Sequence, residues 1–320
     1  MLIGMILFWS LVFIASLVVV VKGSDYLLIG AEKIGLRAGL SPFIVGVTIV
    51  GIGTSLPELV SSLVAVSKGV TDVVVGNAVG SNIANILLIG GFAALITKGL
   101  KAEKDIVDLD IPLLALVTAI FYLVAKDGSV VLMDSIILVV TYGVYLLYTL
   151  IYKEEGKAFE EAMEDAVEEK VKVTTKDMIL LVLGIVGLAA GAKYLIESIT
   201  ELAVIFNIAP GLIAVSAVAI GTSLPELLVS VKAAARGQAE VALGNIFGSN
   251  LFNLLMVVGI PGLFGNLLID EKTFTIGIPM LLIATTLFII SGISKSIHRL
   301  EAIMFLLIYL IFTAQLFGWM

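Results

Sequence analysis

The sequence contains no cysteine, a single histidine and few charged residues. Without cysteine the chain has neither a disulfide framework nor a thiolate metal site. Charged residues make up only 14% of the 320 residues, and no basic stripe of the kind that binds nucleic acid is present. There is no HExxH segment, and no pair of aspartates lies deep within an apolar run, which argues against an intramembrane protease. The sequence therefore contains none of these catalytic motifs, and we do not expect an enzyme.

The residues that are present are mainly apolar. Hydrophobic residues account for 60% of the chain, against roughly 45 to 50% in a soluble domain, and the mean hydropathy is +1.15. The first residues show no positively charged region followed by a small-residue cleavage site, so we expect the opening segment to remain as a span. The composition therefore predicts a polytopic membrane protein that contacts lipid, with no nucleic acid and no obligatory protein partner.

Ten apolar stretches are long enough for the roughly 20 residues that cross a bilayer as a helix. We expect spans near residues 3–33, 41–66, 73–97, 108–125, 131–152, 177–205, 210–234, 240–265, 272–292 and 298–318. The polar segment from Lys153 to Asp177 is acidic and separates five spans from five. Its carboxylates lack the spacing of a calcium-binding loop, so we interpret it as a solvated linker. The expected fold class is therefore all-α with ten transmembrane helices.

The two halves repeat each other. Residues 42–91 align without a gap on residues 210–259, an offset of 168, and roughly half of the positions are identical. Five spans are an odd number, so the second copy must enter the membrane from the opposite side. We therefore expect an inverted-topology repeat of the kind found in secondary transporters, with residues 1–152 as the first repeat, 153–176 as the linker and 177–320 as the second repeat.

The distribution of lysine and arginine predicts the orientation. With both termini outside, inside loops collect most of the basic residues, as the positive-inside rule requires. The expected inside residues are Lys33, Arg37, Lys98, Lys101, Lys104, Lys153, Lys157, Lys170, Lys172, Lys176, Arg236, Lys295 and Arg299, and the expected outside residues are Lys68, Lys126 and Lys272. The linker is then cytoplasmic, in a multi-pass protein of the cell membrane.

The segment GTSLPEL occurs at Gly53 and again at Gly221. Pro57 has no N–H for the carbonyl four residues before it, so we expect the span to be broken or kinked there, with carbonyls freed. Thr54 and Glu58 lie four residues apart on one helical face, with Ser55 beside them. Carbonyl, hydroxyl and carboxylate oxygens are the ligands of hard cations, and a carboxylate in the middle of a membrane span is by default functional.

A second repeated segment supplies further oxygens. In GNAVGSNIAN, Asn77, Ser81 and Asn85 recur every four residues, and Gly76 and Gly80 on the neighbouring face are expected to allow close helix packing. GNIFGSNLFN repeats the pattern. The two copies are expected to bring two glutamates together within a shell of hydroxyls and amides: Glu58, Glu226, Thr54, Thr222, Ser55, Ser223, Ser81, Ser249, Asn85 and Asn253. Two carboxylates would neutralise one Ca2+.

Other polar residues of the spans have a structural interpretation. Asn82 and Asn250 lie off the main face and are expected to hydrogen-bond between helices. Asp25, Lys22 and Lys193 lie toward the ends of spans, where they can snorkel or pair.

The paired motifs GTSLPEL and GNxxGSNxxN, present twice, resemble the alpha repeats of the cation/calcium exchanger superfamily, most closely its prokaryotic sodium/calcium antiporters. The resemblance covers nearly the whole chain. It implies the ten-helix exchanger fold, with two clusters of four core helices and two long tilted helices, here the first and sixth spans, that slide across the core. Transport would exchange Ca2+ for Na+ by alternating access, without a resident cofactor.

The resemblance also implies ligand sets. Calcium would be held centrally by Glu58, Glu226 and the backbone carbonyls of Thr54 and Thr222. Flanking sodium sites would use Gly51, Ser55 and Ser249 on one side and Ala219, Ser223 and Ser81 on the other.

One feature departs from some prokaryotic relatives, which carry an aspartate at one of the positions that Asn85 and Asn253 occupy here. The formal charge of the site is then −2 rather than −3. Exchange of Ca2+, or of another divalent cation, for H+ remains the alternative. A passive channel is disfavoured, because two carboxylates hold an ion too tightly for fast conduction.

Overall fold

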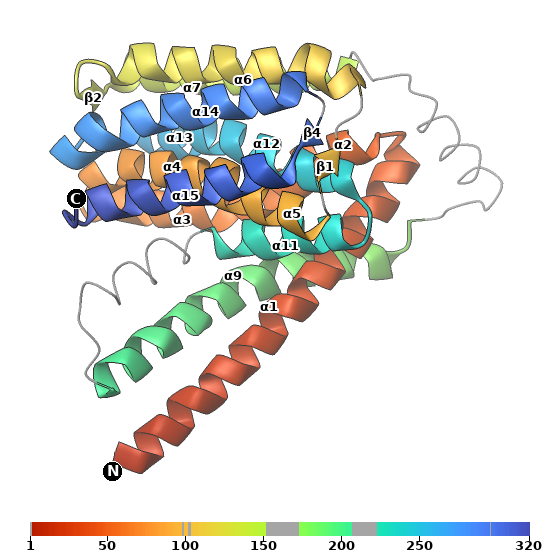
Figure 1. The fold of residues 1–320 in the computed structure, drawn as a ribbon, viewed down its shortest axis with the longest axis vertical. Coiled ribbons are helices and arrows are strands. Elements are labelled where there is room, and N and C mark those ends of the chain that lie inside the picture. The colour runs from red at the N-terminus through yellow and green to blue at the C-terminus, as the bar shows by residue number, and fades with distance from the viewer. Residues whose placement is uncertain (1, 98, 102–103, 152–172, 207–222, 295) are drawn as a thin grey trace.

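A computed structural model of the chain describes residues 2–97, 99–101, 104–151, 173–206, 223–294 and 296–320, and these residues are almost entirely helical (Figure 1). Eight of the described helical segments are long and apolar enough to cross a membrane: Ile3–Ala38, Pro42–Ser67, Asp72–Ile96, Leu132–Thr149, Thr175–Leu202, Ala239–Gly262, Thr273–Ile293 and Arg299–Leu316. A further apolar helical segment covers Asp110–Ala125. The expectation of an all-α polytopic membrane protein is confirmed.

The helices follow the expected spans closely. The first half contains α1 (Leu2–Ala38), α2 (Pro42–Val45), the π-helical turn η1 (Gly46–Val50), α3 (Gly51–Ser67), α4 (Asp72–Ile83), the π-helical turn η2 (Ala84–Ile89), α5 (Gly90–Ile96), α6 (Lys104–Ala125) and α7 (Leu132–Ile151). The second half contains α9 (Thr175–Ile205), α11 (Leu224–Ala235), α12 (Ala239–Phe252), the π-helical turn η3 (Asn253–Val257), α13 (Val258–Gly262), the π-helical turn η4 (Thr273–Gly277), α14 (Ile278–Ile293) and α15 (Arg299–Leu316). Of the expected span 210–234, residues up to 222 lie outside the described part, as does most of the acidic linker.

The helices α1 and α9 form a long tilted pair. They contain 37 and 31 residues, well above the roughly 20 that a perpendicular crossing needs, and they run obliquely to the other helices (Figure 1). They pack against each other beneath the remaining helices (Figure 1). Glycine allows this approach, because a Cβ on Gly184 would lie 2.4 Å from the backbone nitrogen of Leu27. The first and sixth spans are therefore the long tilted helices that the resemblance implies.

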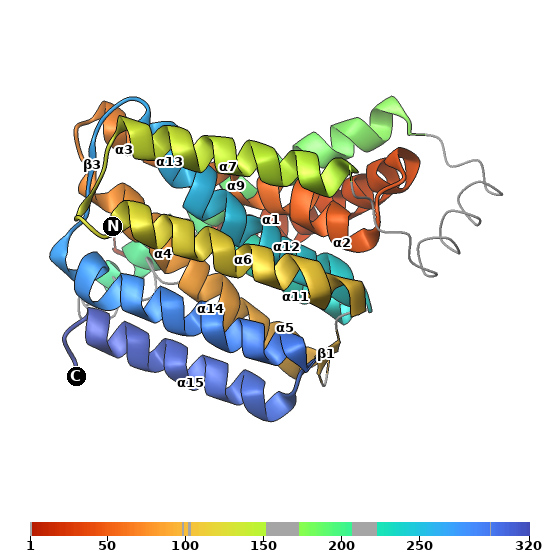
Figure 2. The ribbon, with the colours of Figure 1, turned by 90° about the horizontal axis from the view of Figure 1, so that it is seen from above.

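The centre of the molecule is the segment from α12 to α13. Within its apolar stretch 94% of the residues are buried inside the protein, compared with 11% for α1. Seen from above, α7, α6, α14 and α15 form an outer row beside this centre (Figure 2). The exposed apolar side chains of α1 and of the outer row face the surroundings of the helices, as expected for contact with lipid.

Two short antiparallel ladders join loops from the two halves. The strand β1 (Leu100–Lys101) pairs with β4 (Ser296–Ile297), and β2 (Ser129–Val130) pairs with β3 (Leu267–Leu268). The two ladders lie at opposite ends of the outer row of helices (Figure 1). They therefore connect the halves at both ends of the molecule.

Candidate cation site

The motif GTSLPEL of the first half lies at the start of α3, where it meets α12. The hydroxyl of Thr54 donates to Asn245 Oδ1 at 3.1 Å and lies 3.3 Å from Ser249 Oγ. The Ser249 hydroxyl in turn donates to the carbonyl oxygen of Gly51 at 3.4 Å. Residues from both repeated segments, one from each half of the chain, thus form one buried polar cluster.

The two glutamates are both buried, with 1% exposure each, and they differ in their partners. Ser55 Oγ of α3 donates to Glu226 Oε1 of α11 at 2.9 Å, which joins the two copies of the motif. Glu226 also lies in the first turn of α11, where the helix dipole favours a negative charge. Within the described residues, neither carboxylate oxygen of Glu58 and only one of Glu226 has a hydrogen-bond partner.

Two asparagines add further unpaired polar atoms. Asn85 lies in η2, which packs against α11, and Asn253 begins η3, which packs against α3. Both side chains are fully buried, and neither amide has a partner among the described residues. π-helical turns occur frequently at functional sites, where they change the direction of side chains. A buried charged carboxylate without a partner is strongly unfavourable, so the carboxylates of this cluster must either bind a cation or take up a proton.

Glycines allow the approach that closes the cluster. A Cβ on Gly248 would lie 2.2 Å from the backbone carbonyl oxygen of Val47, and one on Gly244 would lie 2.3 Å from that of Phe43. The expectation of close packing is thus confirmed for the second copy of the motif. It is wrong for Gly80, where a Cβ would meet nothing within 4 Å, because this position of α4 faces a cavity.

That cavity has a volume of about 300 Å³ and reaches two residues of the expected sodium site. Ser81 of α4 and Ser223 at the start of α11 line it together with Asn77. It extends to Asp270 and to the exposed Lys272, near the end of α15. The cavity therefore connects the region of the two serines with one end of the helices.

The structure alters one local expectation about Pro57. The helix is not interrupted at this residue, because α3 continues from Gly51 to Ser67 with Pro57 inside it. The irregular backbone lies earlier, in η1 (Gly46–Val50), which ends before α3 begins at Gly51. A proline within a helix removes one hydrogen bond, but packing on both sides can hold the helix together. Pro225 of the second copy lies in the first turn of α11, where proline is well tolerated.

Several of the expected site residues contact one another or line the same cavity, and two lie outside the described part. Those in the described part are Glu58, Glu226, Thr54, Ser55, Ser223, Ser81, Ser249, Asn85, Asn253 and Gly51. The other two, Thr222 and Ala219, fall within residues 207–222, which the structure does not describe. Asn82 connects helices as expected, since Asn82 Nδ2 donates to the backbone carbonyl oxygen of Asn250 at 3.0 Å. The expectation is wrong for the side chain of Asn250, whose amide has no partner among the described residues.

Sequence reasoning missed two residues that support the site. Asn245 accepts from Thr54, and its Nδ2 donates to Ser230 Oγ at 2.8 Å and to the carbonyl oxygen of Glu226 at 3.4 Å. Asn245 thus holds both the backbone of Glu226 and the side chain of Thr54. The available signal was repetition, because Asn77 and Ser62 occupy the equivalent positions of the first half.

Comparisons with known proteins agree with this geometry. The family described as sodium/calcium exchanger protein matches residues 8–151 and 176–318. The sodium/calcium exchanger MaX1 of Methanosarcina acetivorans is 33% identical over 96% of this chain and 98% of its own. The inner membrane protein YrbG of Escherichia coli is 32% identical over 86% of each chain.

Solved structures give the same result. The sodium-calcium exchanger NCX_Mj, soaked with zero Na+ and Ca2+, has a TM-score of 0.82 and 28% sequence identity, and the match covers 97% of this chain and 99% of that one. Sequence and fold therefore agree over nearly the full length, and this chain belongs to the sodium/calcium exchanger protein family.

Proposed function

We propose that this chain exchanges Ca2+ for Na+ across the cell membrane by alternating access. The observation that carries the proposal is the pair of buried glutamates, Glu58 on α3 and Glu226 on α11, whose remaining carboxylate oxygens have no partner among the described residues. Sodium rather than the proton is favoured as counter-ion by family membership and by the sodium/calcium exchangers among the relatives. The chain is thus a transporter, not an enzyme.

Calcium would occupy the centre of the site. Glu58 and Glu226 would each give a carboxylate, and the backbone carbonyls of Thr54 and Thr222 would complete the central ligands. With asparagine at both positions 85 and 253, the formal charge of −2 balances one Ca2+ without a further carboxylate. Oxygen donors of this kind suit a hard cation such as Ca2+.

Sodium would occupy two flanking positions. On one side Gly51 and Ser249 are already hydrogen-bonded to each other, and Ser55 contacts Glu226. On the other side Ser81 and Ser223 line the same cavity, and Ala219 would supply the counterpart of the Gly51 carbonyl. Since the glutamates would serve both cations, Na+ and Ca2+ must weaken each other's binding, as exchange requires.

Several contacts support two inverted repeats of five helices, formed by residues 1–152 and 177–320. A Cβ on Gly23 would lie 2.9 Å from the backbone nitrogen of Leu188, and one on Gly191 would lie 3.1 Å from that of Val20. These two contacts exchange under the 168-residue offset, as a twofold relation between the repeats requires. The bond between Asn82 and Asn250 likewise joins equivalent positions.

The ends of the helices support the inversion as well. The segment from α12 to α13 begins at Ala239, just after α11, and ends near Gly265, where a Cβ would lie 3.5 Å from Val66 Cγ1 of α3. The equivalent C-terminal ends of α3 and α11 therefore lie at opposite ends of this segment. With both termini outside and the linker of residues 153–176 in the cytoplasm, the cavity at Asp270 opens to the outside.

Flux in reconstituted vesicles tests the function. Vesicles loaded with Na+ should accumulate labelled Ca2+ when diluted into sodium-free medium, whereas vesicles with a proton gradient alone should not. Vesicles containing the double variant Glu58→Gln with Glu226→Gln are the matched control for leakage. Calcium uptake driven by protons and indifferent to sodium would identify the chain as a calcium/proton exchanger and overturn the proposal.

A further inference from the structure

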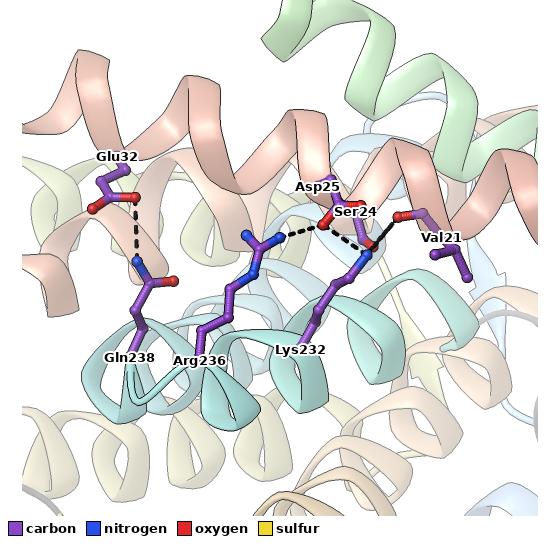
Figure 3. Close-up of polar contacts among 7 residues, drawn as sticks. All are labelled: Val21, Ser24, Asp25, Glu32, Lys232, Arg236 and Gln238. Atoms are coloured by element: carbon purple, nitrogen blue, oxygen red, sulfur yellow. Dashed lines mark hydrogen bonds and ion pairs between the residues drawn. The ribbon is translucent and has the colours of Figure 1, made fainter.

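A cluster of charges joins α1 to α11 outside the cation site. Asp25 Oδ1 of α1 lies 2.8 Å from Nζ of Lys232, in the last turn of α11, and forms a second ion pair with Arg236, the residue that follows α11 (Figure 3). Lys232 Nζ also donates to the carbonyl oxygen of Val21 at 2.7 Å and to Ser24 Oγ at 3.1 Å. We refer to Asp25, Lys232 and Arg236 as the Asp25 cluster.

The Asp25 cluster lies at the end of α11 remote from the cavity. The cavity reaches the start of α11 at Ser223, and the cluster occupies the last turn and the residue that follows it. Beyond Gly237, Gln238 Nε2 donates to Glu32 Oε2 at 3.2 Å, which adds another contact with α1 (Figure 3). At this end α1 is therefore fixed to α11, and at the other end the cavity is open.

The other half of the molecule has no equivalent of the Asp25 cluster. Under the 168-residue offset, Asp25 corresponds to Lys193, Lys232 to Val64 and Arg236 to Lys68. The neighbouring matches of Gly23 with Gly191 and of Tyr26 with Tyr194 support this register. Two cations and an apolar residue cannot form an ion pair. Lys193 instead lies over the ring of Tyr194, 5.5 Å from its centroid.

This asymmetry matters if the transporter alternates as proposed, so the inference rests on that function. Exchanging the roles of the two repeats generates the second state, in which α9 contacts α3 as α1 now contacts α11. The Asp25 cluster would open in that state, and Lys193 would approach Lys68. We propose that the Asp25 cluster biases the exchanger toward the conformation with the cavity open at Asp270, and that the bias is built into one repeat only.

The side chains of the Asp25 cluster are 20 to 39% exposed, so each ion pair is partly screened. A pair of this kind changes an equilibrium constant by about 1.5-fold to fivefold. Two pairs on one carboxylate, with like charges approaching in the other state, are expected to shift the equilibrium on the order of tenfold. The less populated state is then the sensitive one to measure, since its population changes by nearly the full factor.

Two equivalent valines provide reporters in this cysteine-free chain. Val73 lines the cavity and is 49% exposed, whereas its counterpart Val241 is 6% exposed. In the second state the two exposures should be exchanged. The labelling rate of Val241→Cys by a maleimide in detergent, without Na+ or Ca2+, therefore measures the second state, and Val73→Cys measures the first.

Added to Val241→Cys, either Asp25→Asn or the pair Lys232→Gln with Arg236→Gln should raise the labelling rate about tenfold. The swap Asp25→Arg with Arg236→Asp should bring it back toward the starting value. The matched control is Lys33→Gln, which removes the ion pair of Lys33 with Asp177, 2.8 Å apart. This pair lies within α1 and α9, which the proposed alternation would move as one unit. This variant should leave the rate unchanged.

A labelling rate unchanged by the loss of the Asp25 cluster, or raised equally by Lys33→Gln, would overturn the inference. Thermal unfolding of each variant in the same detergent distinguishes a shifted equilibrium from general loosening, because only loosening accelerates labelling in proportion to lost stability. Sodium-driven calcium uptake by the Val241→Cys protein is measured in parallel. If uptake is absent under every gradient, the proposed function fails whatever the labelling; if uptake is present and labelling does not respond, only the bias fails.

Discussion

At the scale of single residues, Glu58 and Glu226 are equivalent in sequence and unequal in environment. Ser55 donates to Glu226, and Glu226 has the start of α11 to stabilise its charge, whereas the carboxylate of Glu58 has no partner within the described residues. A buried charge without a partner lowers the stability of the ion-free protein. In the proposed function, Glu58 is therefore expected to depend on the bound cation more than Glu226 does.

Replacing Glu58 by Gln should separate function from stability. The amide keeps the size of the side chain and removes the charge, so we expect calcium affinity to fall on the order of 100-fold or more, about 3 kcal/mol. The same change should raise the melting temperature of the protein in chelator, because it removes an unpaired buried charge. Calorimetric calcium titration and thermal unfolding measure the two effects. Retained calcium binding would contradict the shared site.

Ser55 and Ser223 should distinguish the two cations. Both hydroxyls are proposed to serve sodium and not calcium, so Ser55→Ala and Ser223→Ala should raise the sodium concentration for half-maximal exchange several-fold and change calcium affinity less. Ser55→Ala should have the larger effect on calcium, because it also removes the hydrogen bond to Glu226. Flux at fixed pH across sodium concentrations measures both. An unchanged sodium dependence with a shifted pH dependence would identify protons as counter-ions.

At the scale of helices, the glycines of α4 and α12 are identical in the motif and different in packing. A Cβ on Gly248 would overlap the backbone of Val47, while one on Gly80 would project into the cavity. We expect Gly248→Ala to destabilise the protein by about 1 to 3 kcal/mol, since backbone must move to make room. Gly80→Ala is the matched control and should leave the melting temperature within about 2 °C. Equal effects of the two substitutions would show that the packing difference is not real.

The sequence predicted elements better than it predicted their local irregularities. The length of the apolar stretches located most spans, because a helix in the membrane must form its backbone hydrogen bonds internally and therefore needs about 20 apolar residues. It could not place the π-helical turns η1, η2 and η3, which depend on how neighbouring helices pack, nor predict that α3 runs through Pro57. The candidate site residues could be proposed from the sequence because the motif repeats. The hydrogen bond between Thr54 and Asn245 could not be predicted, because it depends on where α12 lies relative to α3.

At the scale of the whole molecule, one duplicated unit explains features that each half would leave incomplete. Neither half alone holds two carboxylates, and each loop ladder takes one strand from each half. The proposed inverted relation would place the two copies of GTSLPEL face to face, and the hydrogen bond from Ser55 to Glu226 is the contact that supports it. The differences between the copies, at Asp25 and Lys193 or at Ser55 and its bond to Glu226, then describe which state the molecule occupies.

The proposed topology has a direct test at the two ladders. Asp127 precedes β2 and His298 follows β4, and both side chains are exposed. Because the ladders lie at opposite ends of the helices, an impermeant maleimide added to intact cells should label Asp127→Cys, and His298→Cys should react only after the membrane is permeabilised. Neither substitution touches the cation site, so sodium-driven calcium uptake should persist in both and serve as the control for folding. Labelling of both cysteines from the same side would contradict the inverted repeat, and the reverse pattern would keep the repeat while placing both termini in the cytoplasm.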